Sequence, residues 1–333
     1  MHRTGLVSAN DAMNISFSQG ELHSPKPIFF ENCSCTNIGA SLFGGLLARK
    51  LRRRHAGETW RLRYRAQWSR GHTIRKEGEV FVACSTLCFR QHSLDEALKA
   101  IGDLKFSKID LAIHEHGSHL KPSEVATDVH KIATHLKNAC PLGLAAFHVS
   151  IHAASHEEHD RQLRAVCKLA RITTVPIICV PAPAASMETN QAITRLSDQV
   201  KVASGEGVIL TIETKIGTLA ESPEVAIDLC EKVPGLGLTL DPSDYLVGPA
   251  RDRPFDDVFP YVRHVRLRDT GATPNDYQVR VGQGQVDYGR IVNQLERQRY
   301  DRLLTVDIQD SADARFPMEP EVRKLKYLLE SLV

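Results

Sequence analysis

Three separate segments of the chain end in an acidic residue and share one pattern, Leu-Thr-aliphatic-acid. They end at Glu213, Asp241 and Asp307. If each segment is the end of a strand, side-chain alternation places its threonine and its acid on one face and its apolar residues on the other. Carboxylates that converge away from water need a cation, a guanidinium group or a shared proton, because a buried unpaired charge is costly. We therefore predict a binding or acid–base site at these three residues.

Basic and imidazole side chains follow the same alternation elsewhere. In residues 264–269, which read His-Val-Arg-Leu-Arg-Asp, His264, Arg266 and Arg268 share one face. If this face points inward, these cations meet the three acids. His152 ends another strand-like segment and is a candidate for substrate binding, whereas His156 and His159 open a helix-like segment. Exposed polar residues are expected at such a helix start, so we assign no metal site to them.

From residue 79 onward, short β-branched segments alternate with segments of helical period. The strands we expect are residues 79–85, 108–113, 145–152, 176–180, 208–213, 236–241, 262–267 and 303–308. The helices we expect are residues 93–104, 122–138, 156–172, 188–204, 222–232, 254–259, 287–298 and 319–332. Eight such units predict an α/β protein with a closed (β/α)₈ TIM barrel in residues 79–333. In such a barrel the site lies where the strands lead into the following loops, which is where the three acids fall.

The first 78 residues differ from the rest of the chain in charge. Residues 1–80 carry 13 Lys and Arg against 6 Asp and Glu, although the whole chain of 333 residues is nearly balanced, with 42 against 40. No helical or strand period persists there, so we predict that residues 1–78 form a poorly ordered basic extension. Contact with nucleic acid or a membrane surface is the alternative interpretation.

The cysteines and the hydropathy pattern bear on location. Several of the 8 cysteines lie in apolar segments, where a free thiol packs as a small hydrophobic group. No apolar segment approaches the length of about 18 residues that a membrane-spanning helix needs. We expect reduced thiols, no membrane association and a cytoplasmic protein.

The order of the acidic motifs resembles that of a known family. Ile-Glu-Thr at Glu213, Leu-Asp-Pro-Ser at Asp241, His-Val-x-Leu-x-Asp at 264–269, Gly-Gln-Gly at 282–284 and Val-Asp-Ile at Asp307 resemble the xylose isomerase-like TIM barrels. This family includes sugar-phosphate isomerases and epimerases and the endonuclease IV type of AP endonuclease. The resemblance excludes the N-terminal segment and is strongest in the second half of the chain.

The resemblance implies a divalent ion held by a Glu on strand five, an Asp on strand six, a His on strand seven and a Glu on strand eight. Glu213 and Asp241 match this pattern, and Asp307 matches with a side chain one methylene shorter. These three residues are therefore the expected metal ligands. With oxygen ligands alone, the expected ion is Mn or Mg and not Zn.

Three histidines of the family pattern are missing from this chain. Lys215, Asp244 and Arg266 stand where the family commonly has them. The guanidinium group of Arg266 stays protonated and has no lone pair for a metal. The alternative is thus a metal-free site in which Arg266 and Lys215 supply the positive charge.

The resemblance also implies roles for the individual residues. Glu213 and Asp307 would transfer protons next to a carbonyl, Asp241 would orient the electrophile, and Arg266 or an ion would be that electrophile. The residues expected to bind substrate are His152, Lys215, His264 and Arg268.

The function that follows is that of a sugar or sugar-phosphate isomerase or epimerase with a degenerate metal site, acting on a small carbohydrate. The alternative is a catalytically silent barrel that binds carbohydrate or acts as a scaffold. AP endonuclease activity and a nucleic-acid partner are disfavoured, because the missing histidines would hold the metal that activates the attacking water. A homodimer is compatible with this interpretation.

Overall fold

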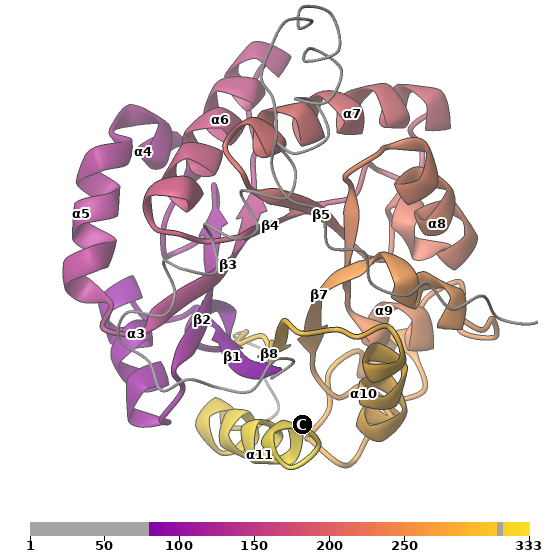
Figure 1. The fold of residues 1–333 in the computed structure, drawn as a ribbon. Coiled ribbons are helices and arrows are strands. Elements are labelled where there is room, and N and C mark those ends of the chain that lie inside the picture. Colours follow the sequence, from indigo (N-terminus) through magenta and orange to yellow (C-terminus); the bar gives the residue numbers. More distant parts are fainter. Residues whose placement is uncertain (1–79, 312–315) are drawn as a thin grey trace, which may run out of the picture. The chain divides into compact units, whose positions relative to one another are not determined.

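The computed structural model describes residues 80–311 and 316–333, and the prediction for residues 1–78 lies outside this part. Eight parallel strands pair in sequence order, and β8 closes the ring onto β1 (Figure 1). The strands are β1 (Phe81–Ser85), β2 (Lys108–His114), β3 (Gly143–Ser150), β4 (Ile177–Pro181), β5 (Ile209–Glu213), β6 (Gly237–Leu240), β7 (Val262–Leu267) and β8 (Leu303–Val306). The predicted (β/α)₈ barrel and all eight predicted strands are thereby confirmed.

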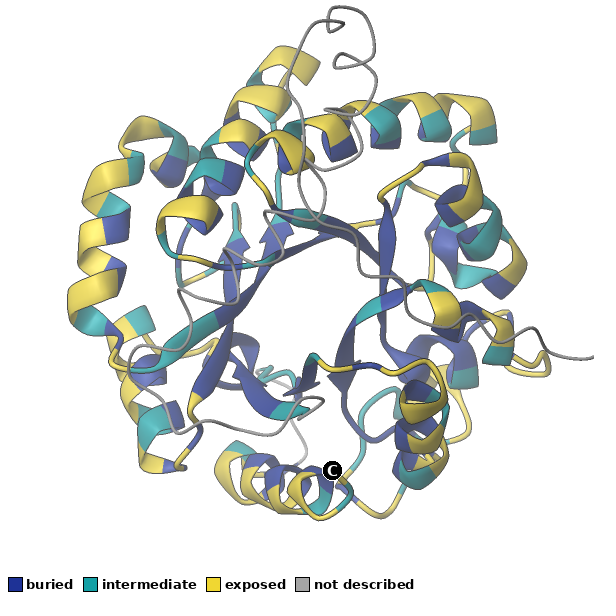
Figure 2. Ribbon diagram, viewed as in Figure 1, coloured by how far each residue is buried: buried dark blue, intermediate teal, exposed yellow. Residues whose placement is uncertain are grey.

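Helices surround the ring of strands. They are α3 (Leu94–Asp103), α4 (Pro122–Thr127), α5 (Val129–Ala139), α6 (His156–Ile172), α7 (Thr189–Gly205), α8 (Pro223–Lys232), α9 (Pro242–Val247), α10 (Tyr288–Arg297) and α11 (Met318–Glu330), with short 3₁₀ turns η1 (Thr86–Phe89), η2 (Leu219–Glu221), η3 (Asp256–Tyr261) and η4 (Pro274–Asp276). The longer helices have a buried inner face and an exposed outer face (Figure 2), whereas the short α9 has no exposed residue. The longer helices thus cover the apolar outer face of the barrel.

The structure corrects two of the predicted helices and adds one. The single helix expected at 122–138 is two helices, because Asp128 has non-helical backbone angles and its side chain accepts a hydrogen bond from the Lys131 N–H, which caps α5. The helix expected at 254–259 is the 3₁₀ turn η3. The short helix α9, which follows β6, was not predicted from the sequence.

The inside of the barrel is layered as the alternation of side chains predicts. Thr211 of β5 and Thr239 of β6 meet through their hydroxyl oxygens at 2.7 Å. Thr305 of β8 pairs in register with Arg266 of β7. The acidic residues come two positions after these threonines, so they lie nearer the ends from which the loops leave.

Two further properties of the described residues concern membrane-spanning helices and disulfides. None of its helices is long and apolar enough to cross a membrane. Its six cysteines are buried and form no disulfide among the described residues.

Candidate active site at the barrel mouth

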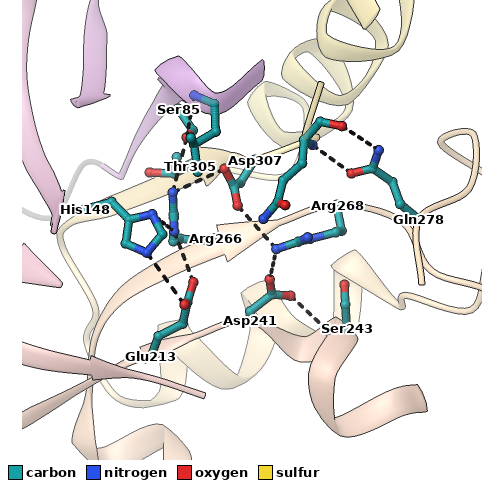
Figure 3. Close-up of polar contacts among 12 residues, drawn as sticks. Ser85, His148, Glu213, Asp241, Ser243, Arg266, Arg268, Gln278, Thr305 and Asp307 are labelled. Carbon is teal, nitrogen blue, oxygen red and sulfur yellow. Dashed lines mark hydrogen bonds and ion pairs between the residues drawn. The ribbon is translucent and has the colours of Figure 1, made fainter. Parts of the chain in front are cut away.

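The guanidinium group of Arg266 lies at the centre of the barrel mouth and is completely buried (Figure 3). Its Nη1 donates to Glu213 Oε1 at 3.0 Å and to His148 Nδ1 at 2.6 Å. Its Nη2 donates to Ser85 Oγ and to Asp307 Oδ1, both at 3.2 Å. These acceptors come from β1, β3, β5 and the end of β8, so one side chain joins strands from around the ring.

Asp110 completes the surroundings of Arg266 and was not predicted as a site residue. Its Oδ2 lies 3.2 Å from Arg266 Nε and 3.0 Å from His264 Nε2. Burial would raise the pKa of Asp110, but Arg266 and His264 outweigh this effect and hold it below the usual value. The alternation rule applied to β2 identifies this position, because an aspartate in the middle of an apolar strand must face the barrel interior.

Arg268, two residues further along β7 and its following loop, uses only one of its three guanidinium nitrogens in hydrogen bonds. Its Nη2 donates to Asp241 Oδ2 and to Asp307 Oδ2, the latter at 3.3 Å. Its guanidinium carbon lies 4.8 Å from the centre of the Tyr277 ring, as in a cation–π contact. Its Nε and Nη1 are buried and have no hydrogen-bond partner among the described residues. Such unpaired buried donors are costly, so they mark a place where a ligand oxygen would be stabilised.

Asp241 links the site to the start of α9. Its Oδ1 accepts a hydrogen bond from the Ser243 N–H at 3.0 Å, and Pro242 occupies the first turn of the helix. This N-cap fixes the rotamer of Asp241 and directs its other oxygen to Arg268. Burial raises the pKa of Asp241 above its usual value even though Arg268 opposes the shift.

Glu213 retains one oxygen that accepts no hydrogen bond from the described residues, Oε2. His148 Nε2 lies 3.6 Å from it and Lys215 Nζ lies 3.8 Å from it. Because a guanidinium group can only donate, His148 Nδ1 must accept from Arg266, which leaves its proton on Nε2, facing Glu213. Burial alone would raise the pKa of Glu213, but His148, Arg266 and Lys215 together lower it well below its usual range.

Asp244 stands where the family pattern has a histidine. It accepts hydrogen bonds from the Ile216 N–H at 3.0 Å and from the Tyr277 hydroxyl at 2.9 Å. Burial and then the neighbouring charge of Asp241 raise the pKa of Asp244 to about 7. This carboxyl group therefore ties two loops of the mouth together and changes its charge near neutral pH.

The Gly-Gln-Gly motif has a structural role. Asp269 Oδ2 accepts from the Gly282 N–H at 2.7 Å and from the Gly284 N–H at 3.0 Å. A Cβ atom at Gly284 would collide with the Asp269 carboxylate and the Thr270 carbonyl, so only glycine fits there. The motif thus fastens the loop between β7 and α10, which carries Tyr277.

The structure brings most of the predicted site residues together. Arg266 contacts both Glu213 and Asp307, and Arg268 contacts Asp241. Lys215 lies at the edge with a half-exposed side chain. Two predicted substrate residues lie elsewhere: His264 is buried against Asp110, and His152 is exposed with its ring centre 4.6 Å from that of His116. Besides Asp110, sequence analysis did not select His148, Ser85 or Tyr277 as site residues.

The residues at the mouth do not fit a divalent ion. Among residues 80–311 and 316–333, no group of three or more His, Cys, Asp or Glu residues is arranged to hold a metal. The expected ligands Glu213 and Asp307 instead turn their oxygens to Arg266, and Asp241 turns to Arg268. Guanidinium groups therefore meet the carboxylates that a metal would need.

Comparisons with known proteins agree with this fold. The family model described as "Xylose isomerase-like TIM barrel" matches residues 90–330. A comparison with curated protein sequences found no match.

Several solved structures share the barrel at low sequence identity. A xylose isomerase-like TIM barrel protein from Mycobacterium smegmatis in complex with magnesium is 15% identical, with a TM-score of 0.60 over 78% of this chain and 100% of that one. L-ribulose 3-epimerase is 14% identical, with a TM-score of 0.59 over 76% and 95%. The probable 3-DHS dehydratase AsbF from Bacillus anthracis is 14% identical, with a TM-score of 0.58 over 75% and 99%.

Proposed function

Because this chain belongs to the xylose isomerase-like TIM barrel family, we propose that it acts on a sugar or polyol by proton transfer next to a carbonyl, with guanidinium groups in place of a divalent ion. The substrate group bound at the mouth is neutral. Four buried carboxylates there, those of Asp110, Glu213, Asp241 and Asp307, face only two buried guanidinium groups, so a further anion would be repelled.

The observation that carries the proposal is the pair of unpaired nitrogens on Arg268. Nε and Nη1 are buried, and their N–H groups donate no hydrogen bond to any described residue. A carbonyl oxygen placed against them would be polarised, and the negative charge that develops on it in an enediolate would be stabilised. Arg268 is therefore the electrophile of the proposal. This role passes from Arg266, because its Nη1 and Nη2 already donate to protein acceptors. Its Nε makes no hydrogen bond with a described residue but lies 3.2 Å from Asp110 Oδ2.

Glu213 is the proposed base, acting through Oε2. It would take the proton from the carbon next to the carbonyl, while the electrons of that C–H bond form the carbon–carbon double bond of the enediolate. The N–H of His148 and the ammonium group of Lys215 flank this oxygen at 3.6 and 3.8 Å. They hold the carboxylate in place and also weaken it as a base.

Asp307 has a different role from the one expected for a second proton-transfer group. Each of its oxygens accepts from a guanidinium group, Oδ1 from Arg266 and Oδ2 from Arg268. Both oxygens are therefore engaged in charge-assisted hydrogen bonds. In the proposal Asp307 positions the two arginines. Glu213 alone returns the proton, to the former carbonyl carbon, while the hydroxyl group on the carbon that lost its proton passes its own proton to the former carbonyl oxygen and becomes the new carbonyl. This 1,2-shift is an isomerisation.

Deuterium incorporation tests this function. The full chain is incubated in heavy water with a panel of keto sugars and inosose-like polyols, and exchange at the carbon next to the carbonyl is followed by NMR. We expect exchange with the native chain, in EDTA as well as without it, and its loss in E213Q by about 100-fold or more. The matched control is E224Q, which changes an exposed glutamate of α8, the helix that follows the same strand, and should leave exchange intact.

A second candidate function is carbohydrate binding without catalysis. The low pKa of Glu213 favours it, because a weak base abstracts protons poorly. In that case one or more sugars of the panel bind and raise the temperature of thermal unfolding, and R268Q abolishes this binding. No deuterium enters any of the bound compounds. That result would exclude the enzymatic proposal while retaining the role of Arg268.

A further inference from the structure

A second cavity opens beside the end of β3, and its chemistry is the opposite of that at the mouth. It has a volume of about 390 Å³, which is within the range of small-molecule pockets. Its wall contains one guanidinium group and three imidazoles, and no carboxylate. The lining residues are Ile151, His152, Ala153, Ala154, Ser155, His156, His159 and Arg195.

Arg195 is the strongest feature of this cavity. It projects from α7, is half-buried, and makes no ion pair or hydrogen bond with any described residue. By contrast, the fully buried guanidinium groups of the described residues, those of Arg266 and Arg268, contact carboxylates. An unpaired guanidinium group facing a cavity is best satisfied by an oxyanion, with which it forms charge-assisted hydrogen bonds.

Of the two acidic residues beside His159 in the sequence, Glu158 is engaged by an arginine, whereas Asp160 stays close to the His159 ring. Both oxygens of Glu158 accept from Arg161 at 2.7 Å. Asp160 is half-exposed and lies 3.6 Å from His159 Nδ1, outside hydrogen-bond range. The side chain of His159 is only 16% exposed, so it forms a partly desolvated wall. The first turn of α6 adds backbone N–H groups that no helical carbonyl uses.

We propose that this cavity, defined by Arg195, His152, His156 and His159, binds a phosphate group. Arg195 supplies the charge, and the imidazole N–H groups supply directional donors. Because His152 is the fourth residue after His148 of the central cluster, the Cα atoms of the two residues are at most about 14 Å apart. The phosphate is either part of a substrate whose neutral end reaches Arg268 or a free oxyanion that acts beside the site.

Binding of inorganic phosphate to the full chain tests the pocket without reference to activity. Titration calorimetry at constant ionic strength should show one saturable site, and R195Q should weaken it at least about tenfold. R251Q is the matched control, because it removes an exposed arginine outside the cavity and should bind phosphate as the native chain does. H159Q should weaken binding without removing a permanent charge.

Two ligands distinguish the sources of the phosphate. If it belongs to the substrate, fructose 6-phosphate binds more tightly than inorganic phosphate, and R268Q removes that advantage. If the oxyanion is free, both bind equally and R268Q changes neither. The proposal is overturned if the native chain shows no saturable phosphate binding, or if R195Q binds phosphate as tightly as the native chain. Neither result bears on deuterium exchange at Glu213.

Discussion

Arg266 and Arg268 lie two residues apart on the same face of the barrel, yet their surroundings differ. Each nitrogen of Arg266 lies within 3.2 Å of a protein acceptor, although Nε makes no hydrogen bond with a described residue, and the carboxylates beside it, Asp110 and Glu213, have lowered pKa values. Arg268 uses one nitrogen and leaves two without a partner among the described residues, and its partner Asp241 has a raised pKa. We call the first region closed because acceptors surround its guanidinium group, and the second open because two guanidinium nitrogens have no acceptor beside them.

This difference separates stability from binding. In the closed region Arg266 and His264 lower the pKa of Asp110, and His148, Arg266 and Lys215 lower that of Glu213, so Arg266 is the cation that the two carboxylates share. In the open region the carboxyl groups tolerate protonation, and the spare donors of Arg268 are available to a ligand. One strand thus supplies an internal counter-ion at one position and a ligand-binding group two residues later.

Removing Arg266 should have the largest effect on stability. R266M leaves buried carboxylates from three strands without their cation, and breaking a buried ion pair in this way costs about 3–5 kcal/mol. Urea unfolding at pH 7, followed by circular dichroism, measures the loss. A free energy of unfolding within about 1 kcal/mol of the native value would show that the network is not what holds these strands together.

R268M is the matched comparison on the same strand. Asp241 can take up a proton when its partner is lost, because its pKa is already raised. We expect a smaller loss of about 1–3 kcal/mol, together with loss of sugar or polyol binding at the barrel mouth. If R268M is destabilised as strongly as R266M, the distinction between a closed and an open region is wrong.

A smaller and pH-dependent effect is expected at Asp244. Its pKa is about 7 in the folded chain and lower in the unfolded chain, so the folded state binds more protons between about pH 4 and pH 7. Stability contributed by the protonated group is therefore present below pH 4 and is lost as the pH rises through 7. D244N, which cannot ionise, should remove this loss and be more stable than the native chain at pH 8 by about 2 kcal/mol.

The pH series also contains its own control. At pH 4 the native carboxyl group is protonated, so D244N and the native chain should unfold at similar urea concentrations. A constant difference between them from pH 4 to pH 8 would mean that Asp244 does not titrate in this range.

The barrel could be predicted from the sequence because its signals are local. Each strand is a short β-branched segment, and period-2 alternation was enough to place Arg266 and Arg268 on one face with Glu213, Asp241 and Asp307. The break at Asp128 was missed, because a single N-cap interrupts an otherwise continuous helical period.

The site was predicted only in outline because the remaining contacts are long-range. Asp110 and Arg266 are far apart in the sequence, and no local pattern pairs them, although alternation in β2 marks Asp110 as inward-facing. Nor does the sequence show which of the two guanidinium groups, that of Arg266 or that of Arg268, has protein acceptors beside all of its nitrogens. That depends on Ser85 and His148, which other strands bring to Arg266 and not to Arg268.

The central claim is that Arg266 takes the place of a divalent ion, and thermal unfolding in Mn²⁺ and in EDTA tests it most directly. The native chain should unfold at the same temperature in both, to within about 1 °C, whereas R266H, which restores the histidine of the family pattern, should gain a shift of about 3 °C or more in saturating Mn²⁺. A native chain that Mn²⁺ stabilises and EDTA destabilises would contradict the claim.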